Sequence, residues 1–183
     1  MGRNQVRIIG GSWRSRLISF PPRIDLRPTP DRARETLFNW LGQDLSGKTC
    51  LDLFAGSGAL GFEAASRGAK RVVMVERDPA VFSALRANAA ALDAVSVELR
   101  RADALEFLHA DDGLYDVVFL DPPFRADYVP RVLPALIARL AEGAMIHVEA
   151  PRALDLPPEW MVWRSDRAGA VTYQLLKWTG HES

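Results

Sequence analysis

Four consecutive residues, Asp121, Pro122, Pro123 and Phe124, have the types that point most directly to a reaction. They follow Tyr115–Leu120, an apolar segment typical of a buried strand. A carboxylate and a proline carbonyl in a stiff turn offer two acceptors for the hydrogens of an amino group. Holding both hydrogens directs the nitrogen lone pair at an incoming methyl group and stabilises the charge that develops on nitrogen. The ring of Phe124 offers a face for an unstacked base.

We therefore predict that these four residues are catalytic and that they transfer a methyl group to the exocyclic amino group of a base. The structural alternative is an ordinary proline turn whose aspartate is hydrogen-bonded to its surroundings. A nicotinamide-dependent enzyme has no use for a turn of this kind.

A glycine-rich turn after the strand expected at residues 49–53 is the second candidate site. Gly56, Gly58 and Gly61 have the spacing of a dinucleotide-binding fingerprint, and Glu76 stands twenty residues after Gly56. Glycines let a ligand approach the main chain closely, and the carboxylate of Glu76 suits the hydroxyls of a ribose. The pattern fits a nicotinamide or flavin cofactor, S-adenosylmethionine, or a turn that binds no ligand.

Acidic residues near this turn favour S-adenosylmethionine, because Asp52 would attract its sulfonium and ammonium groups and would repel a pyrophosphate. Asp103 could accept a hydrogen bond from an adenine amino group, or cap the helix expected at residues 104–109. We therefore expect S-adenosylmethionine as the cofactor. The cofactor-binding candidates are Asp52, Phe54, Ala55, Gly56, Ser57, Gly58, Glu76, Arg77, Asp103 and Ala104.

Alternating strands and helices are expected to position both turns. Strand–helix alternation predicts a parallel sheet covered on both faces, with ligands bound at the carboxyl ends of the strands. The chain closes with an apparent antiparallel hairpin, 160–164 and 171–178, joined near Gly169. The strands are expected at 49–53, 71–76, 95–99, 115–120 and 144–148, and the helices at 59–67, 79–90, 104–109 and 128–140.

Two elements precede the sheet. Residues 5–20 are expected to form short strands around a Gly10–Gly11 turn, a hairpin too small to hold its own core. A helix follows, with Thr29 as its cap, Pro30 at its first position and Gly42 after its end. Its buried stripe is predicted to consist of Ala33, Leu37 and Leu41. We expect residues 1–26 to be an N-terminal arm and residues 27–183 to be the main domain.

The N-terminal segment is strongly basic although the chain as a whole is neutral. From Met1 to Arg34 there are eight arginines and two aspartates, a net charge of +6, so the remainder carries −6. Arginines of this density suit a polyanion, although a solvated face explains the charge equally well. The candidates for contacts with nucleic acid are Trp13, Arg14, Arg16, Arg32 and Arg34.

Other features of the sequence limit the classes of protein. The single cysteine, Cys50, excludes an internal disulfide framework and fits a reducing compartment, so we expect a cytoplasmic protein. No apolar run approaches the ~20 residues of a membrane-spanning helix. His109, His147 and His181 lack metal-ligand spacing, and the proposed chemistry needs no metal. We expect a monomer that does not associate with membranes.

Taken together, these motifs resemble the bacterial small-subunit ribosomal RNA guanine-N2 methyltransferases of the RsmD type. The glycine turn and the proline turn also occur in other amino-methyltransferases, including DNA adenine-N6 enzymes. The more specific likeness therefore lies in residues 7–14 and 27–40. The matching stretches are 7–14, 27–40, 52–61, 66–69, 75–76 and 121–124.

The resemblance implies a Rossmann-like, class I S-adenosylmethionine-dependent methyltransferase of the α/β class. Its sheet would have seven strands, mostly parallel, with a terminal antiparallel hairpin and an N-terminal β-hairpin extension. The implied substrate is a guanine of 16S ribosomal RNA within an assembling small subunit. Three alternatives stay open: an adenine-N6 methyltransferase, an NAD(P)-dependent oxidoreductase, and an inactive RNA-binding protein on the same scaffold.

Overall fold

The computed structural model describes residues 4–22, 29–123 and 127–180. An N-terminal hairpin of two strands and then a helix precede the main sheet. The strands are β1 (Asn4–Arg7), β2 (Leu17–Phe20), β3 (Thr49–Asp52), β4 (Arg71–Glu76), β5 (Val97–Arg101), β6 (Tyr115–Leu120), β7 (Leu140–Ala150), β8 (Trp160–Ala168) and β9 (Val171–Trp178). The helices are α1 (Asp31–Leu41), α2 (Ala59–Ser66), α3 (Pro79–Leu92), α4 (Ala104–Ala110), α5 (Val129–Leu136) and a 3₁₀ turn, η1 (Ile137–Arg139).

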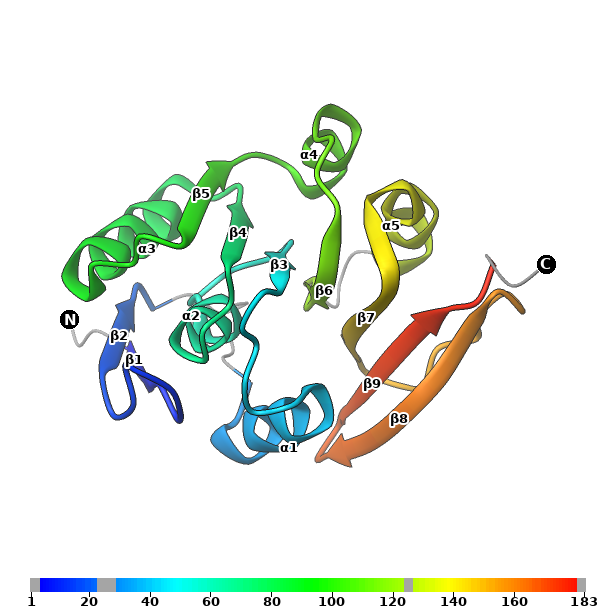
Figure 1. Ribbon diagram of the computed structural model, residues 1–183, viewed down its shortest axis with the longest axis horizontal. Helices are drawn as coiled ribbons and strands as arrows, with labels where there is room; N and C mark the ends of the chain where they lie inside the picture. The colour runs from blue at the N-terminus through cyan, green and yellow to red at the C-terminus, as the bar shows by residue number, and fades with distance from the viewer. Residues whose placement is uncertain (1–3, 23–28, 124–126, 181–183) are drawn as a thin grey trace.

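The main sheet has seven strands in the order β5-β4-β3-β6-β7-β9-β8 (Figure 1). Strands β3 to β7 pair in parallel, and β9 runs antiparallel to both β7 and β8. The expected fold is confirmed: a Rossmann-like α/β sheet with a terminal antiparallel hairpin. The terminal hairpin is longer than predicted, because β8 continues to Ala168.

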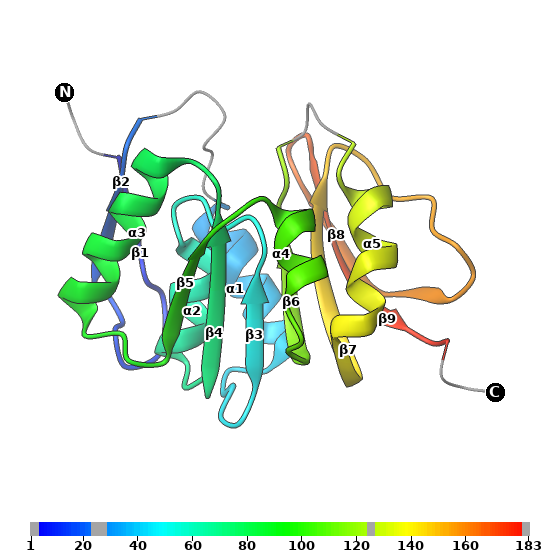
Figure 2. The same ribbon diagram turned by 90° about the horizontal axis from the view of Figure 1, so that it is seen from above.

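Both faces of the sheet are covered, because the side chains of each central strand alternate between two apolar clusters. Val72 and Met74 face the cluster that includes α1, α2 and α3, whereas Val73 and Val75 face the cluster that includes α4 and α5. Figure 2 shows α4 and α5 on one side of the strands and α1 and α2 on the other. None of the helices in the described part of the chain is long and apolar enough to span a membrane.

The strand order reverses direction at β3, which pairs with β4 on one side and with β6 on the other. The connections after β3 and β6 therefore cross to opposite faces of the sheet, the arrangement in which open α/β folds form a ligand-binding crevice at the carboxyl edge. The glycine turn follows β3 and the acid–proline turn follows β6, so this topology brings the two predicted sites to the same crevice.

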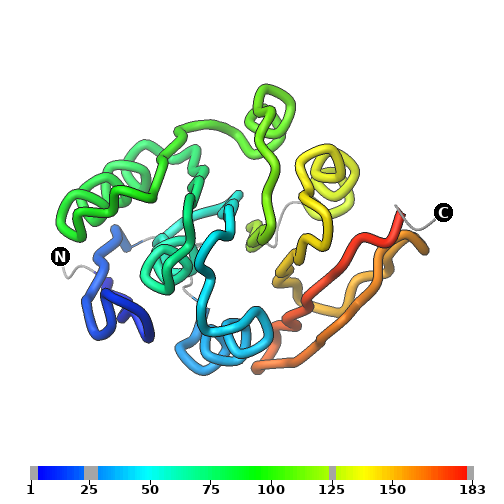
Figure 3. The backbone as a smooth tube through the Cα atoms, viewed as in Figure 1, coloured from blue at the N-terminus to red at the C-terminus, as the bar shows by residue number. Residues whose placement is uncertain are grey.

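The β1–β2 hairpin forms a separate two-stranded sheet that lies beside α3 in the backbone trace (Figure 3). Asn88 of α3 fixes it, because its amide accepts from Ser19 N at 3.2 Å and donates to Ser19 O at 2.8 Å. Ile18 and Phe20 are buried in the same apolar cluster as α1 and α2. The predicted boundary between residues 26 and 27 lies outside the described residues.

Helix α1 differs from its prediction in two respects. Thr29 does not cap the helix, since its hydroxyl is bonded to Glu149 and the residue before the helix is Pro30. The buried stripe consists of Arg34, Leu37 and Phe38, whereas Ala33 and Leu41 are only half-buried. The four-residue spacing located the helix but missed an arginine on its inner face.

Candidate active site

The acid–proline turn begins directly after β6, where the strand reaches the crevice. Asp121 is half-buried, Pro122 is buried and Pro123 is half-buried. Phe124, the fourth predicted catalytic residue, lies outside the described residues. A proline at position 122 fixes the direction of the main chain there, so the Asp121 carboxyl and the Pro122 carbonyl keep a constant relation to each other.

Asp121 does not lie alone, because its carboxyl group is hydrogen-bonded to that of Glu149 at the end of β7. Burial raises the pKa of Asp121 well above its usual value, and the charges of Glu149 and Asp52 raise it further. A nearby negative charge favours the protonated form of a carboxyl group. Asp121 can therefore take up a proton at the carboxyl edge of the sheet.

Glu149 is held from two directions. Its Oε1 accepts a hydrogen bond of 2.6 Å from the Thr29 hydroxyl and lies 3.1 Å from His147 Nε2. His147 in turn stacks on Tyr173 of β9, with ring centroids 6.1 Å apart and an interplanar angle of 12°. These contacts fix Glu149 next to Asp121. The sequence analysis did not identify Glu149 as a site residue.

The sequence does contain a signal for Glu149. Each parallel strand of the sheet has an acidic residue no more than two positions from its last residue. In β7 that acidic residue is Glu149. The others are Asp52 on β3, Glu76 on β4, Asp103 after β5 and Asp121 after β6. The crevice is therefore rich in carboxyl groups, which suits a ligand that carries positive charge.

The glycine turn has the backbone that its sequence requires. Gly58 stands before α2 with a φ of 84°, and a Cβ atom there would lie 2.6 Å from the ring of Phe62. Gly56 also has a positive φ, of 53°. Neighbouring Ala55, Ser57 and Gly58 are buried, whereas Phe54 and Gly56 are half-buried. Position 58 therefore requires glycine for its φ and for the packing of Phe62, and the partly exposed part of the turn is at Phe54 and Gly56.

Glu76 joins the glycine turn to the end of β4. Its Oε2 accepts a hydrogen bond of 3.0 Å from Gly56 N, and its Oε1 accepts one of 2.9 Å from Asp78 N. Each carboxylate oxygen accepts more than one hydrogen bond. Because Glu76 is half-buried at the crevice, it retains acceptor capacity for a pair of ribose hydroxyls.

Asp52 and Asp103 also lie at the carboxyl edge. Asp52 Oδ2 accepts a hydrogen bond of 3.0 Å from Gly61 N, and burial, with the charges of Glu76 and Glu149, raises its pKa to about 7. Asp103 caps α4, because its Oδ1 accepts from Leu105 N at 2.9 Å and from Glu106 N at 3.3 Å. Asp103 is half-buried and Ala104 is buried, and the prediction that Asp103 accepts from an adenine amino group stays a prediction.

A second residue missed from the sequence, Tyr128, bridges two parts of the predicted cofactor site. Its ring lies 5.3 Å from that of Phe54, and its hydroxyl accepts a hydrogen bond of 3.2 Å from Arg77 Nη1. Tyr128 immediately precedes α5, four residues after the end of the acid–proline turn. It connects the glycine turn with the residue that follows Glu76. Its only signal in the sequence is an aromatic residue shortly after that turn.

The arm residues lie at the opposite edge of the molecule. Trp13 N donates to Ser66 Oγ at 2.9 Å, and Ser66 is the last residue of α2, whereas the crevice is at the first. Arg16 is exposed and donates to Ala91 O at 3.0 Å, near the end of α3. An eight-residue helix is ~12 Å long, so the structure separates Trp13, Arg14 and Arg16 from the acid–proline turn.

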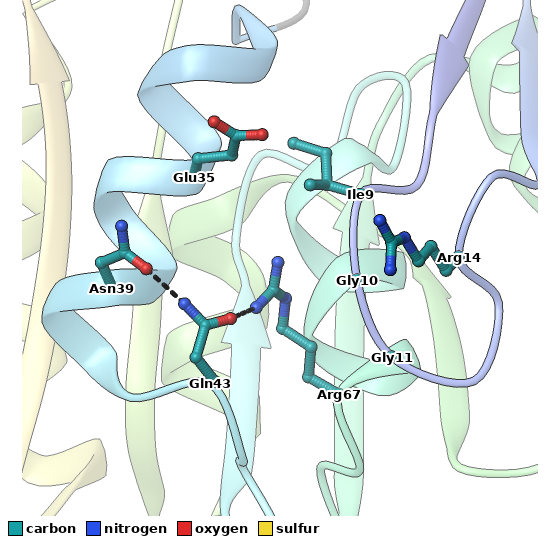
Figure 4. A pocket seen from close by; sticks show the side chains of 8 residues that line it. All are labelled: Ile9, Gly10, Gly11, Arg14, Glu35, Asn39, Gln43 and Arg67. Carbon is teal, nitrogen blue, oxygen red and sulfur yellow. Dashed lines mark hydrogen bonds between the residues drawn. The ribbon is translucent and has the colours of Figure 1, made fainter.

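Arg14 is exposed and lines a cavity of about 460 Å³ between the hairpin, α1 and the end of α2 (Figure 4). Gln43 lies between Asn39 and Arg67 in this cavity and is hydrogen-bonded to both. Gly11 closes its edge with a φ of 77°, where a Cβ atom would lie 1.9 Å from Ser66 O. The hairpin turn thus requires glycine in order to approach α2.

The prediction that Arg34 contacts nucleic acid is wrong. Its side chain is 0% exposed, and its Nη1 lies 3.3 Å from Glu63 Oε2, which is also 0% exposed. Arg34 also donates to Arg7 O at 2.8 Å and bonds to Asp31 at 2.5 Å. The guanidinium therefore ties α1 to α2 and to the hairpin. Arg32, two residues earlier, is exposed at the crevice end of α1.

Comparisons with known proteins agree over nearly the whole chain. A family model described as Conserved hypothetical protein 95 matches residues 6–177. Ribosomal RNA small subunit methyltransferase D of Escherichia coli (strain K12) is 42% identical, over 95% of this chain and 90% of that protein.

Solved structures show the same likeness. A putative methyltransferase, yhhF, from Escherichia coli has a TM-score of 0.85 and 43% identity, with 96% of this chain and 98% of that chain covered. An RNA methyltransferase from Salinibacter ruber, in complex with S-adenosyl-L-homocysteine, has a TM-score of 0.63 and 25% identity, with 81% and 92% covered.

The resemblance inferred from the motifs is thereby confirmed, and the protein is a methyltransferase. Its glycine turn and its acid–proline turn, and most of its N-terminal hairpin, fall inside the matched region, residues 6–177. The chain belongs to the RsmD family of methyltransferases, the family that the description Conserved hypothetical protein 95 denotes.

Proposed function

We propose that this protein methylates the exocyclic N2 amino group of a guanine in 16S ribosomal RNA, with S-adenosylmethionine as the methyl donor. The observation that carries the proposal is the meeting of the acid–proline turn and the glycine turn in one crevice. The relative from Escherichia coli, which is named a ribosomal RNA small subunit methyltransferase, supports the class of substrate.

The residues of the crevice fit S-adenosylmethionine. Gly56 has no side chain at a half-buried position of the turn where φ is positive, and Glu76 retains acceptors for the ribose hydroxyls. Asp103 would accept from the adenine amino group, and Phe54 with Tyr128 would form an apolar wall. The donor supplies an activated methyl group on a sulfonium centre. Carboxyl groups such as Asp52 favour that cation and disfavour the pyrophosphate of a nicotinamide cofactor.

The acid–proline turn would act on the target amino group. Asp121 and the Pro122 carbonyl accept its two hydrogens, which directs the lone pair of the nitrogen away from the ring. As the nitrogen becomes positively charged, the same two acceptors stabilise it. Asp121 then receives the proton that the methylated nitrogen loses, and the contact with Glu149 allows that proton to be shared. Pro123 stiffens the turn, and Phe124 is proposed to stack on the base.

We propose two groups of RNA contacts, one close to the acid–proline turn and one far from it. Arg32 is exposed at the crevice end of α1 and would contact phosphates close to the target. Trp13 and Arg14 lie near the far end of α2 and Arg16 lies near the end of α3, so they would reach only a distant part of a large substrate. A small ribosomal subunit in the course of assembly is such a substrate. We expect the protein to act on it as a monomer in the cytoplasm.

Mass spectrometry of nucleosides tests the proposal. Small ribosomal subunits from cells that lack this protein would be incubated with the purified protein and with donor carrying a deuterated methyl group. We expect labelled N2-methylguanosine from 16S RNA, in an amount of about one per subunit. Label on the N6 atom of adenosine would replace guanine by adenine as the target, and no label in RNA would refute the proposed substrate.

A further inference from the structure

A groove of about 370 Å³ separates α1 from the turn that joins β8 and β9. Arg32, Ala33 and Trp40 line it from α1, whereas Arg167, Ala168 and Tyr173 line it from the hairpin. Its volume lies within the range of about 300–1,000 Å³ that is usual for ligand sites.

The groove is hollow because small residues line the middle of both walls. Ala33 and Thr36 face it from α1, and Ala168 and Gly169 face it from the hairpin. Ala33 is half-buried for this reason, although the periodicity of α1 predicts a buried residue. Between Pro30 and Trp40 the helix rises ~15 Å, so the groove is long enough for more than one nucleotide.

Tyr173 relates the groove to the acid–proline turn, because it lines the groove and the charges of Glu149 and Asp121 act on its hydroxyl. Tyr173 is 6% exposed and stacks on His147, which contacts Glu149. Burial and the charges of Glu149 and Asp121 raise the pKa of its hydroxyl. Thr29, next to the groove residue Pro30, bonds to Glu149 as well. If Asp121 holds the target base, the nucleotides on either side of that base in the RNA strand would therefore lie at the opening of this groove.

The groove carries groups that suit a single strand of RNA. Arg32 and Arg167 face it from opposite walls, and both side chains are exposed. Arg167 Nε donates to Gly169 O at 3.1 Å, which holds the guanidinium at the rim and leaves its other nitrogens to bind phosphate. Asp166 is the acid of the lining, and its Oδ1 accepts from Arg167 N at 2.7 Å. Trp40 is half-buried and offers part of its ring for stacking.

We propose that this groove binds the single-stranded nucleotides adjacent to the methylated base, with Arg32 and Arg167 contacting their phosphates and Trp40 stacking on a base. The inference rests on the proposed function, because it requires RNA as the substrate. It assigns to the β8–β9 hairpin, which supplies no residue to either turn of the crevice, the task of directing the strand into it.

Steady-state kinetics with small ribosomal subunits from cells that lack the protein give the first test. We expect Arg167→Ala and Arg32→Ala each to raise KM about tenfold, the loss typical of one charge-assisted hydrogen bond, and to leave kcat within about twofold. The matched control is Arg164→Ala, since Arg164 is an exposed arginine of β8 that stacks on Trp163 outside the groove. Its KM should not change. An unchanged KM for Arg167→Ala would overturn the proposal.

Crosslinking gives a second test, which does not depend on the loss of a charge. A photoreactive benzoylphenylalanine would replace Thr36 in the groove, and crosslinks to the subunits would be mapped by reverse transcription. We expect a crosslink to RNA within about two nucleotides of the methylated guanine. A crosslink only to ribosomal protein would assign the groove to a peptide and refute the proposal. Methylation of RNA by the wild-type protein is measured before both tests. If the wild-type protein methylated no RNA, that result would refute the proposed function itself.

Discussion

The hydroxyl of Thr29 donates a hydrogen bond of 2.6 Å to Oε1 of Glu149, although 120 residues separate the two in the sequence. This bond joins the start of α1 to the end of β7 at the point where Glu149 contacts Asp121. Helix α1 thus supports the proposed catalytic carboxyl group through one intermediate residue. The link suggests that substitutions at Glu149 act on the ionisation of Asp121.

Replacement of Glu149 by glutamine is expected to move the acid limb of the pH–rate profile to lower pH. Burial and the negative charge of Glu149 raise the pKa of Asp121, so removal of that charge lowers it. Asp121 then stays ionised, and able to accept the amino hydrogens, in more acidic solution. The profile of kcat against pH measures the shift. Glu142→Gln, at an exposed position of β7, should leave the profile unchanged. A limb that moved to higher pH would contradict this account.

Glu76→Gln is expected to weaken the binding of S-adenosylhomocysteine about 10–100-fold, because two charge-assisted hydrogen bonds to ribose hydroxyls lose their anionic acceptor. The bond to Gly56 N, which shapes the glycine turn, is weakened as well. Isothermal titration calorimetry measures the affinity, and Glu106→Gln, at an exposed position of α4, is the control. Equal affinities for the two variants would remove Glu76 from the cofactor site.

Arg34→Met is expected to destabilise the protein by about 1–3 kcal/mol, because the buried Glu63 loses one of its two arginine partners and the carbonyl of Arg7 loses its donor. Glu63 would lose the contact with Arg34 and keep those with Arg67, Ile9 N and Gly10 N. Urea denaturation of the wild type and the variant measures the free energy of unfolding. Arg32→Met changes an exposed residue on the same helix and should cost less than about 0.5 kcal/mol. A small loss for Arg34→Met would show that the buried ion pair contributes little.

The double variant Arg14→Ala/Arg16→Ala should reduce the salt dependence of binding to small ribosomal subunits. Each lost phosphate contact lowers the slope of log K against log salt by about 0.7–0.9. Because both residues lie far from the acid–proline turn, the single-turnover rate at saturating substrate should not change. Filter binding at several salt concentrations measures the slope. An unchanged slope would exclude the arm from the interface with RNA.

Most of the correct predictions about the fold and the site rest on residues that are close together in the sequence. The strands and helices follow from local periodicity, and the two turns follow from adjacent residues of unusual type. The acid after each strand was recognised at Asp52, Glu76, Asp103 and Asp121. These four acids lie at one edge of the sheet because strand–helix alternation requires parallel strands, whose carboxyl ends meet at the same edge.

Contacts between distant residues could not be predicted. Arg34 was taken for a surface arginine because nothing local distinguishes it, and its partner Glu63 is 29 residues away. Thr29 has the type and position of a helix cap, yet its hydroxyl bonds to Glu149. The groove beside Ala33 requires the β8–β9 hairpin to stand next to α1, which no periodicity in either segment indicates.

The central claim is that Asp121 acts on the target amino group and not on the cofactor. Single-turnover methyl transfer to small ribosomal subunits by Asp121→Ala, with calorimetric titration of S-adenosylhomocysteine, tests it most directly. Asp127→Ala, at an exposed position, is the control. We predict that Asp121→Ala keeps its affinity for the ligand and transfers the methyl group about 10²–10³-fold more slowly. Transfer at the wild-type rate would contradict the account.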